Sequence, residues 1–447
     1  MLRFWFLLIL NAPILAEVIR KYLIPNDLVF LGADVAAAVT LGIICANKKL
    51  RPPPLPLMFY VFSGAFIFCT LALQMFVESN FGIYSIGFRA NYMPIVYLLL
   101  SASFFKTQPN AAKYLFASAT FWIIVAALMA AAQIALGKDH PINNVWGLQG
   151  GGIGDYVSAK GEHIDRSLFR PTSIFMHTGK FGQVAFILVL FRLCYTLYNG
   201  RKTNKLLLPL FGFDLVALFI SGQRGAFLFI SISLVILILL SAKSGRKTAL
   251  QMTSFAAVFS VVVGSLITMF PQYGTAFYER FYSAIEALPR RLQGNLIDPF
   301  ATIFSEFLVT GRGFGYYTFG SRAFGGTVVY NDRHLALSGF GESTIVRMCL
   351  ETGFLFTLIN IAVFIVIYVK ALAARRGFGR SLPGSSIIFY LLWIGSLILW
   401  SNTADVFGNT IPMFYGYALS GAILLNRRNL NHSKKIPLSA KPTVWPK

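Results

Sequence analysis

The sequence predicts an all-α polytopic membrane protein with about 12 transmembrane helices and two long loops on the side away from the cytoplasm. Apolar residues make up 56% of the 447 residues and charged residues only 13%, and the mean hydropathy is +0.65. The apolar residues gather in long runs, and the basic residues lie between these runs. A soluble enzyme is therefore excluded. The net charge of +22 indicates membrane topology rather than binding of nucleic acid.

A helix needs about 20 mainly apolar residues to cross a bilayer, because its backbone polar groups must be satisfied within the segment. Twelve runs meet or approach this length. The first resembles a signal peptide, but its cleavage would leave an odd number of spans, so we interpret it as a retained helix. In chain order the runs are Leu2 to Ile19, Leu28 to Ala46, Leu55 to Val77, Tyr92 to Phe105, Tyr114 to Leu136, Phe181 to Leu197, Leu206 to Ser221, Ala226 to Ser241, Met252 to Phe270, Gly353 to Leu372, Ile387 to Trp400 and Ile411 to Leu425.

The distribution of Lys and Arg predicts that both termini are cytoplasmic, because positive charges near helix ends stay on that side. With this orientation the short external loops hold only Arg20, Lys21, Arg89 and Arg224. The short cytoplasmic loops hold fourteen basic residues: Lys48, Lys49, Arg51, Lys106, Lys113, Arg201, Lys202, Lys205, Lys243, Arg246, Lys247, Arg375, Arg376 and Arg380.

This topology divides the chain into alternating membrane and loop regions. The predicted parts are spans one to five (1–136), a first external loop (137–180), spans six to nine (181–270), a large second external loop (271–341), spans ten to twelve (342–425) and a basic cytoplasmic tail (426–447). The second loop is predicted to contain amphipathic helices, which either roof a cavity at the interface or pack on the bundle. Their apolar stripes are Phe277, Phe281, Ile285 and Leu288, and Phe300, Ile303, Phe304, Phe307 and Leu308.

A turn of small residues between spans seven and eight places Arg224 at an external helix boundary. Small neighbours leave room for a ligand, and the guanidinium group presents a fixed fork of donors that suits phosphate oxygens. The start of the next helix adds a favourable dipole, so the turn is suited to a diphosphate. The alternative is an arginine that merely extends to the lipid headgroups.

The second external loop is rich in cations that alternate with aromatic residues and glycines, as in the stretch from Thr310 to Tyr317. Arg can bind phosphate and glycine allows close backbone approach, so we interpret these cations as candidate substrate-binding residues. Glu342 and Arg347 stand just before span ten, where charge indicates function, although a structural Glu–Arg pair is the alternative. The candidate binding residues are Arg280, Arg290, Arg291, Arg312, His334 and Arg347, with Arg170 at the end of the first loop.

The sequence also lacks several common catalytic patterns. It has no Asp-x-Asp pair in the external loops and no compact His/Asp/Glu cluster, so a metal site is not expected. A Walker lysine, a GxSxG elbow and a credible nucleotide fingerprint are missing too. The four cysteines have neither disulfide nor zinc spacing. We therefore expect chemistry that uses arginines and one general base, without a metal or cofactor.

Several of these motifs, in this order and spacing, resemble the superfamily of O-antigen ligases and Wzy-type polysaccharide polymerases. They are the Ser221 to Gly225 turn, Arg170-Pro171-x-Ser-x-Phe, the Thr310 to Gly315 stretch and Glu351-Thr352-Gly353-Phe354-Leu355. The resemblance covers about Arg170 to Phe364, and the earlier spans match only in hydropathy.

The resemblance implies an all-helical glycosyltransferase in the bacterial inner membrane that acts on the periplasmic side without metal or nucleotide sugar. Its donor would be an oligosaccharide linked to undecaprenyl diphosphate, and its partners a glycan acceptor, membrane lipids and, as a candidate, a chain-length regulator. In this family arginines bind the diphosphate, a role that falls here on Arg224 and on Arg290 or Arg291.

The family's ligases carry His-Asn about nine residues before the Glu that opens the next span, and the His activates the acceptor. This chain has Glu342 and Ser343 at that position, so either Glu342 or His334 is the expected base. The difference favours a polymerase over a ligase that transfers glycan to lipid A core. A lipid-linked oligosaccharide flippase or secondary transporter is the alternative from another class.

Overall fold

The computed structural model describes most of the predicted spans and parts of the external loops. The described residues are 2–24, 28–74, 80–137, 140–143, 171–175, 178–199, 207–242, 246–269, 282, 286, 289, 293–318, 343–378, 381–400 and 410–425. Every regular element in this part of the chain is helical, which confirms the predicted all-α class there.

Each of the twelve predicted apolar runs coincides with a helix or a pair of short helices. The helices are α1 (Leu2–Leu10), α2 (Ala12–Tyr22), α3 (Leu28–Ala46), α4 (Leu57–Gln74), α5 (Phe81–Thr107), α6 (Ala111–Leu136), α8 (Thr178–Asn199), α9 (Leu207–Ser221), α10 (Arg224–Ala242), α11 (Arg246–Met269), α17 (Phe354–Phe378), α18 (Leu382–Trp400) and α19 (Thr410–Ala418), followed by the 3₁₀ turn η5 (Gly421–Leu424). Between α11 and α17 lie the π-helical turn η2 (Gln293–Ile297) and α14 (Asp298–Glu306), both in the predicted second loop, and α16 (Thr344–Thr352), which follows that loop.

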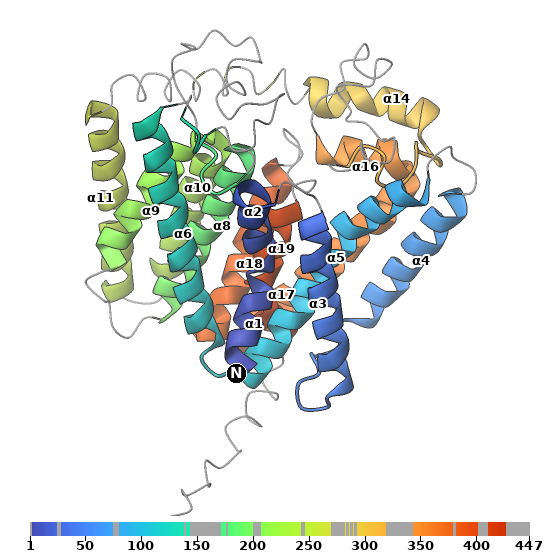
Figure 1. Cartoon of the computed structure of the whole chain (residues 1–447), viewed down its shortest axis with the longest axis horizontal. Coiled ribbons are helices and arrows are strands. Elements are labelled where there is room, and N and C mark those ends of the chain that lie inside the picture. The colour runs from blue at the N-terminus through green and yellow to red at the C-terminus, as the bar shows by residue number, and fades with distance from the viewer. Residues whose placement is uncertain are drawn as a thin grey trace, which may run out of the picture.

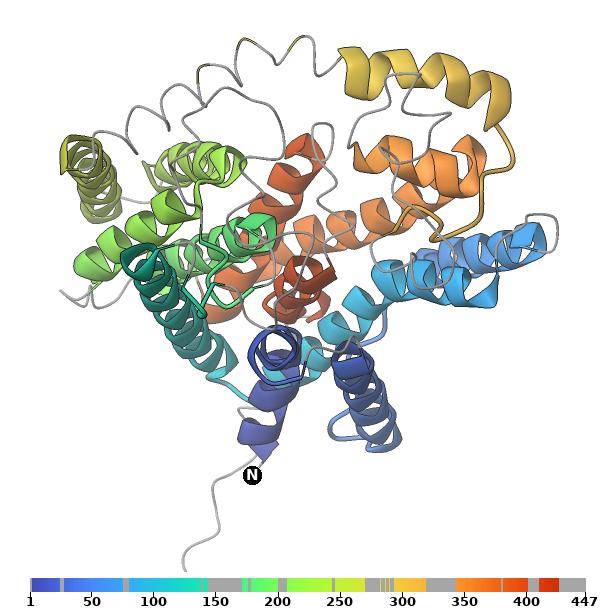
Figure 2. The same cartoon turned by 45° about the horizontal axis from the view of Figure 1, so that its top comes forward.

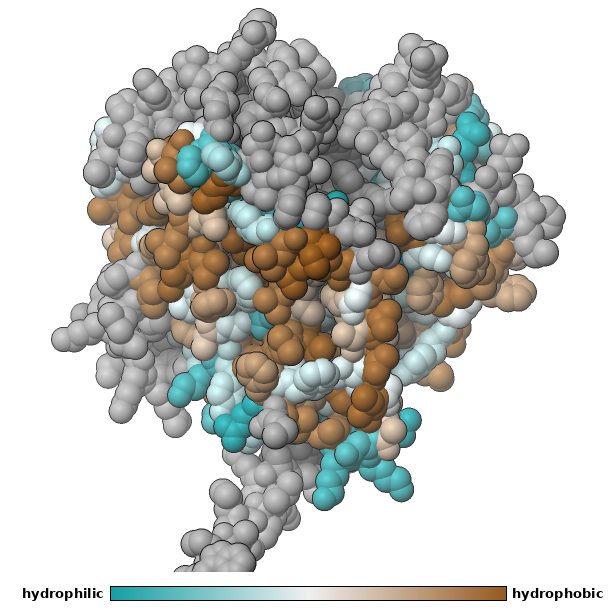
Figure 3. Space-filling view, viewed as in Figure 1, coloured by the Kyte–Doolittle hydropathy of each residue, from teal (hydrophilic) through white to brown (hydrophobic). Residues whose placement is uncertain are grey.

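Six of the described helices are long and apolar enough to cross a membrane, and the bent pair α1 and α2 makes a seventh candidate. On the face seen in Figure 3, apolar residues gather across the middle of the molecule. Large side chains in this band are exposed, such as Leu57 and Phe68 on α4 and Leu239 on α10. Because such exposure is favourable only in lipid, the protein is a multi-pass membrane protein.

The first predicted span is not one straight helix, because α1 and α2 meet at an angle of 60°. Pro13 in the first turn of α2 has no N–H to continue the hydrogen bonds of α1. The side chain of Asn11 occupies the break. It donates to the carbonyl of Leu7 and accepts from Ser118 and Trp122 of α6, so the polar groups at the bend have partners.

Helix α8 lies at the centre of the bundle and packs against α6, α9, α10, α18 and α19. Helix α19 in turn contacts α2, α5 and α8, so it joins the two sides of the molecule (Figure 2). In Figure 1, α14 and α16 lie at the end of the bundle opposite the N-terminus of α1. This placement agrees with the prediction that the second loop and the N-terminus face opposite sides of the membrane.

Only part of the apolar stripe predicted from Phe300 to Leu308 is buried in the structure. Ile303 and Phe307 are buried against Val346 and Leu350 of α16, whereas Phe304 is half exposed and contacts the ring of Phe354. Helix α14 therefore packs on the end of the bundle, which was the second of the two predicted arrangements for the helices of this loop. The other stripe, from Phe277 to Leu288, lies outside the described residues.

Candidate functional site

The turn between α9 and α10 has the short form that the sequence predicted. Helix α9 ends at Ser221, Gly222 takes a left-handed φ of 61°, and Arg224 is the first residue of α10. A Cβ atom on Gly182 of α8 would collide with the side chain of Gln223. The turn therefore packs directly against the first turns of α8, although the structure does not describe the side chain of Arg224.

The glycine-rich segment 310–318 forms a tight backbone contact with the last turn of α16. The N–H groups of Arg312 and Gly313 donate to the carbonyls of Leu350 and Glu351 at 2.8 and 3.0 Å. A Cβ atom on Gly311 would collide with the backbone of Glu351. Glycine is required there by the contact between two backbones, whether or not a ligand binds nearby.

The same segment also packs on α5, through a contact between two glycines. A Cβ atom on Gly87 would lie 2.7 Å from the backbone nitrogen of Gly315. Gly315 itself has a φ of 94°, a conformation that other residues adopt only with strain. These two requirements fix the segment on the N-terminal half of α5.

Replacement of Gly315 by Ala is expected to lower the free energy of unfolding by about 1–3 kcal/mol, because the new Cβ meets both a positive φ and the carbonyl of Ile83. The matched control is Gly64→Ala in α4, where the added Cβ meets open space and improves helix propensity by about 1 kcal/mol. Thermal unfolding of the purified variants measures both changes. Equal melting temperatures for the two variants would contradict the packing described for Gly315.

Two aromatic residues of the segment are buried in the protein interior. Phe314 is buried against the rings of Phe66 and Tyr84, and Tyr317 is buried beside α16. Neither ring is placed to stack on a sugar. The side chain of Arg312, by contrast, is exposed and remains a candidate for binding substrate.

Arg347 points into the protein and pairs with Glu351, one helical turn later, at 3.0 Å. Both side chains are buried, and the same Glu351 oxygen accepts from the hydroxyl of Thr318 and the N–H of Tyr317 at 2.9 and 3.0 Å. Arg347 also donates to Thr318 at 2.7 Å. This network holds segment 310–318 on α16, so the structure assigns Arg347 a structural partner other than Glu342.

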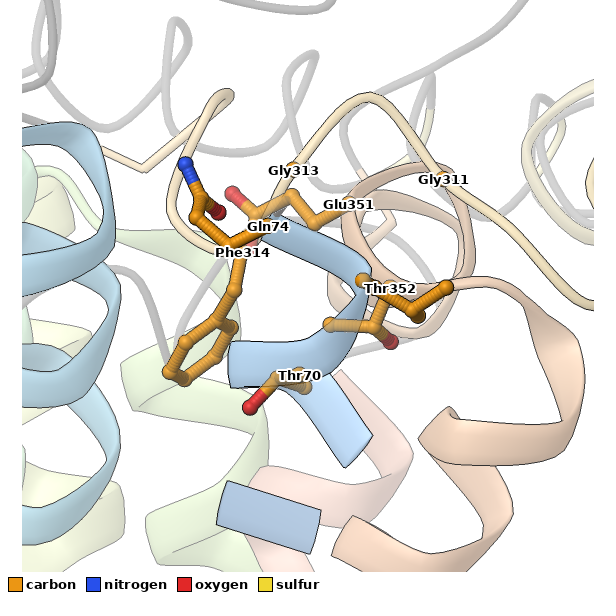
Figure 4. A pocket seen from close by; sticks show the side chains of 8 residues that line it. Thr70, Gln74, Gly311, Gly313, Phe314, Glu351 and Thr352 are labelled. Carbon is orange, nitrogen blue, oxygen red and sulfur yellow. The ribbon is translucent and has the colours of Figure 1, made fainter. Parts of the chain in front are cut away.

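A small pocket lies beside this network, between the end of α4 and the junction of α16 and α17 (Figure 4). Its lining combines the glycine segment with polar groups of both helices: Thr70, Leu73, Gln74, Gly311, Gly313, Phe314, Glu351 and Thr352. Gly353, with a φ of 87°, separates α16 from α17, so Glu351 closes a short helix rather than opening the span.

A cluster of cations surrounds the ring of Phe30, in the first turn of α3. The charged groups of Arg20 (α2), Arg89 (α5) and Lys180 (α8) lie 5.3, 5.7 and 5.9 Å from its centroid. Arg89 also lies 5.3 Å from the ring of Phe414 of α19. We refer to Phe30, Arg20, Arg89 and Lys180 as the Phe30 cluster. It brings together four helices, α2, α3, α5 and α8, and Phe414 lies against it from a fifth, α19.

Two carboxylates support this cluster from the interior. Lys180 pairs with Glu17 at 3.0 Å, and Arg89 pairs with Asp34. The Arg89 and Lys180 side chains are each 20% exposed, whereas those of Asp34 and Glu17 are 8% and 0% exposed. In each ion pair, therefore, the cation is more accessible to solvent than the carboxylate.

The end of the first external loop is held beside the cluster by Ser173, which has a φ of 56°. Its carbonyl accepts from Lys21, Tyr22 and Gln133, its N–H donates to Gln133 at 2.7 Å, and its hydroxyl donates to the carbonyl of Ala126 at 2.6 Å. Such a strained conformation persists only where the surroundings fully determine it. The motif that begins at Arg170 thus ends in a rigid attachment of the loop to α2 and α6.

The structure places only part of the site predicted from sequence. Arg312 and Arg347 are described in full and both lie at α16, whereas Arg224 is described only as a helix position. The remaining candidates lie outside the described residues: Arg170, Arg280, Arg290, Arg291, His334 and Glu342. Within the described part of the chain, no group of three His, Cys, Asp or Glu side chains is suited to hold a metal ion.

The Phe30 cluster was not predicted, because Arg20 and Arg89 stood in the sequence only as exceptions to the charge rule. One usable signal was present: Glu17 stands four residues before Lys21, and such an acidic residue within an apolar run indicates a partner. No protein-family model matches this chain, and no curated protein matches it either. The similarity to the ligase and polymerase superfamily, based on short motifs, therefore stays a prediction.

Proposed function

We propose that the protein is a periplasmic-face glycosyltransferase that polymerises oligosaccharide units carried on undecaprenyl diphosphate, as a member of the O-antigen ligase and polymerase superfamily. The observation that carries the proposal is the packing of the Arg224 turn against the start of α8 at Gly182, two residues from Lys180. A predicted diphosphate-binding arginine and a cationic cluster thus occur at the same end of the bundle. That end faces the periplasm in the proposed topology of twelve spans with both termini cytoplasmic.

The proposed reaction is a single inverting displacement at the anomeric carbon of the donor. The acceptor hydroxyl oxygen forms the new glycosidic bond, and its proton passes to Glu342. The bond between the anomeric carbon and the carrier oxygen breaks, and undecaprenyl diphosphate leaves with the electron pair. Arg224, together with Arg290 or Arg291, would stabilise the negative charge that grows on the leaving group, a contribution of about 3–4 kcal/mol per well-placed donor.

Deletion of the gene in its host tests the biological role. A polymerase deletion is expected to leave surface glycans that carry one repeat unit, because attachment to the cell surface still works. A ligase deletion would instead remove the glycan from the lipid A core altogether, which would refute the polymerase assignment and favour the ligase. A deletion that leaves the length and amount of every surface polysaccharide unchanged would contradict both.

The orientation predicts which engineered cysteines react with a membrane-impermeant thiol reagent in intact spheroplasts. Cysteines at Ser158 and Gly326, in the two external loops, are expected to react, and one at Ser244 is not. The native Cys349 should add little background, because burial raises the pKa of its thiol to about 11, against a smaller opposing effect of Thr357, and only the thiolate reacts. Reaction at Ser244 alone would reverse the topology.

A flippase or transporter is the second candidate, and one observation favours it. Arg192 of α8 and Asp214 of α9 form a buried pair at 2.7 Å, well inside two apolar helices. Charges at such depth are characteristic of transport pathways, although a pair of this kind also joins helices without moving any substrate. A transporter would move the lipid-linked oligosaccharide without breaking a glycosidic bond, so product analysis distinguishes the two functions.

A further inference from the structure

The Phe30 cluster lies at the same end of the bundle as the two parts of the predicted site. On one side, Lys180 belongs to the same turns of α8 as Gly182, against which the Arg224 turn packs. On the other side, Arg89 follows Gly87 of α5 by two residues, and Gly87 contacts segment 310–318. Residues two apart on a helix lie at nearly the same height, so a ligand at the cluster would lie at the same end of the bundle as the Arg224 turn and the glycine segment.

The charges of the cluster favour an anion. Three cations meet around one ring, and the two carboxylates paired with them, Glu17 and Asp34, lie behind Lys180 and Arg89 in the interior. The carboxylates hold the cations in place, while the accessible surface remains positive. Because the side chains of Arg89 and Lys180 are only 20% exposed, their attraction for a negative group is stronger than in bulk solvent.

The position of Lys180 strengthens this conclusion. It lies in the first turn of α8, where the helix dipole disfavours a cation and favours an anion. The ion pair with the buried carboxylate of Glu17 offsets part of this unfavourable interaction between Lys180 and the helix dipole. A negative group above Lys180 would interact favourably with both the ammonium group and the helix, as phosphates do at helix N-termini.

The chemistry of the surrounding groups selects the kind of anion. Arg20 and Arg89 offer planar forks of donors that match phosphate oxygens, and Lys180 offers a compact charge. The rings of Phe30 and Phe414 add an apolar surface next to these donors. A phosphate group at the head of an apolar chain satisfies both features, as at basic lipid-binding pockets between membrane helices.

We propose that the Phe30 cluster binds the diphosphate of the lipid-linked donor, as a subsite that positions the carrier beside the Arg224 turn. This inference rests on the proposed function for the identity of the lipid. The shared chemistry is a lipid phosphate, which either an isoprenoid carrier or a phospholipid headgroup can supply.

The test is the affinity of the purified full-length protein, in phosphatidylcholine nanodiscs, for undecaprenyl diphosphate. Arg20→Gln is expected to weaken binding about tenfold or more, the usual effect of losing a charged hydrogen bond. The variant Lys180→Gln leaves Glu17 beside the buried ammonium group of Lys21, so the carboxylate keeps a counter-charge, and it should weaken binding to a similar extent. Melting temperatures verify that each variant is folded.

The matched control is Arg3→Gln. Arg3 also lies over an aromatic ring, that of Tyr114 at 5.7 Å, and donates to its hydroxyl at 2.8 Å, but it does so at the N-terminal end of the bundle. This variant should bind undecaprenyl diphosphate as the wild type does. Unchanged affinity in both folded cluster variants would overturn the subsite, and so would an equal loss in the control.

Two further arms separate this inference from the proposed function. Phosphatidylglycerol should compete weakly, since it carries a single phosphate; competition equal to that of undecaprenyl diphosphate would overturn the assignment to the donor and indicate a headgroup site. In the transfer assay, cluster variants should raise the KM for the donor. If the wild type binds undecaprenyl diphosphate through the cluster but forms no polymer, the proposed function fails and the subsite stands.

Discussion

Replacement of Arg224 by Ala is expected to reduce polymer formation by about 10²- to 10³-fold, the usual cost of losing one donor that stabilises charge in a transition state. Arg224 is the first residue of α10, and Gly222 lets the chain turn sharply enough to bring it there. The start of α10 and the guanidinium group would therefore act on the same leaving diphosphate. Polymer length and amount in cells with normal protein levels measure the effect.

Two further variants define what Arg224 contributes. Arg224→Lys should restore little activity, because an ammonium group cannot bind two oxygens in a fixed geometry. Arg246→Ala provides the matched control, since Arg246 likewise begins a helix, α11, but at the predicted cytoplasmic side. Full activity of the lysine variant would show that charge alone suffices, and a loss in Arg246→Ala as large as that in Arg224→Ala would indicate a general effect on folding.

Replacement of Glu342 by Gln is expected to reduce turnover by about 10²- to 10⁴-fold, because it keeps the shape of the side chain and removes the general base. Glu342 immediately precedes Ser343, the residue that caps α16, and α16 is fixed to segment 310–318 by the network of Arg347 and Glu351. Binding of the carrier lipid should be unchanged.

The companion variant His334→Ala decides between the two candidate bases. If Glu342 accepts the proton, His334→Ala should retain most of the turnover in vitro. A loss of turnover in His334→Ala together with wild-type turnover in Glu342→Gln would identify His334 as the base and refute the assignment to Glu342.

The positions of the helices could largely be predicted from hydropathy, because lipid requires continuous apolar surface. The predicted and observed bounds of α3 are identical, from Leu28 to Ala46. Helix α5 begins at Phe81, eleven residues before the predicted apolar run. The charge of Arg89 interrupts the apolar run in the sequence. In the structure Arg89 pairs with Asp34, so the helix continues through this position. The break at Asn11 was also missed, although Pro13 was a local signal for it; the hydrogen bonds from α6 that satisfy Asn11 have no such signal.

The site was less predictable because its key contacts join distant parts of the chain. Nothing local in the sequence indicates that Gly87 meets Gly315, or that Arg20, Arg89 and Lys180 share one ring. The turn at Arg224 was predictable, because a short stretch of small residues between two apolar runs indicates a tight turn without any information about distant parts of the chain. Long-range pairing gives no periodic pattern, and only the three-dimensional fold reveals it.

The most direct test of the proposed function is the reaction of the purified protein with a lipid-linked repeat unit in proteoliposomes that contain no other enzyme. The proposal predicts that glycan chains longer than one unit form, and that one undecaprenyl diphosphate is released for each new glycosidic bond. Movement of the intact donor across the bilayer, with neither bond formation nor release of the carrier, would contradict the proposal and establish the transport alternative.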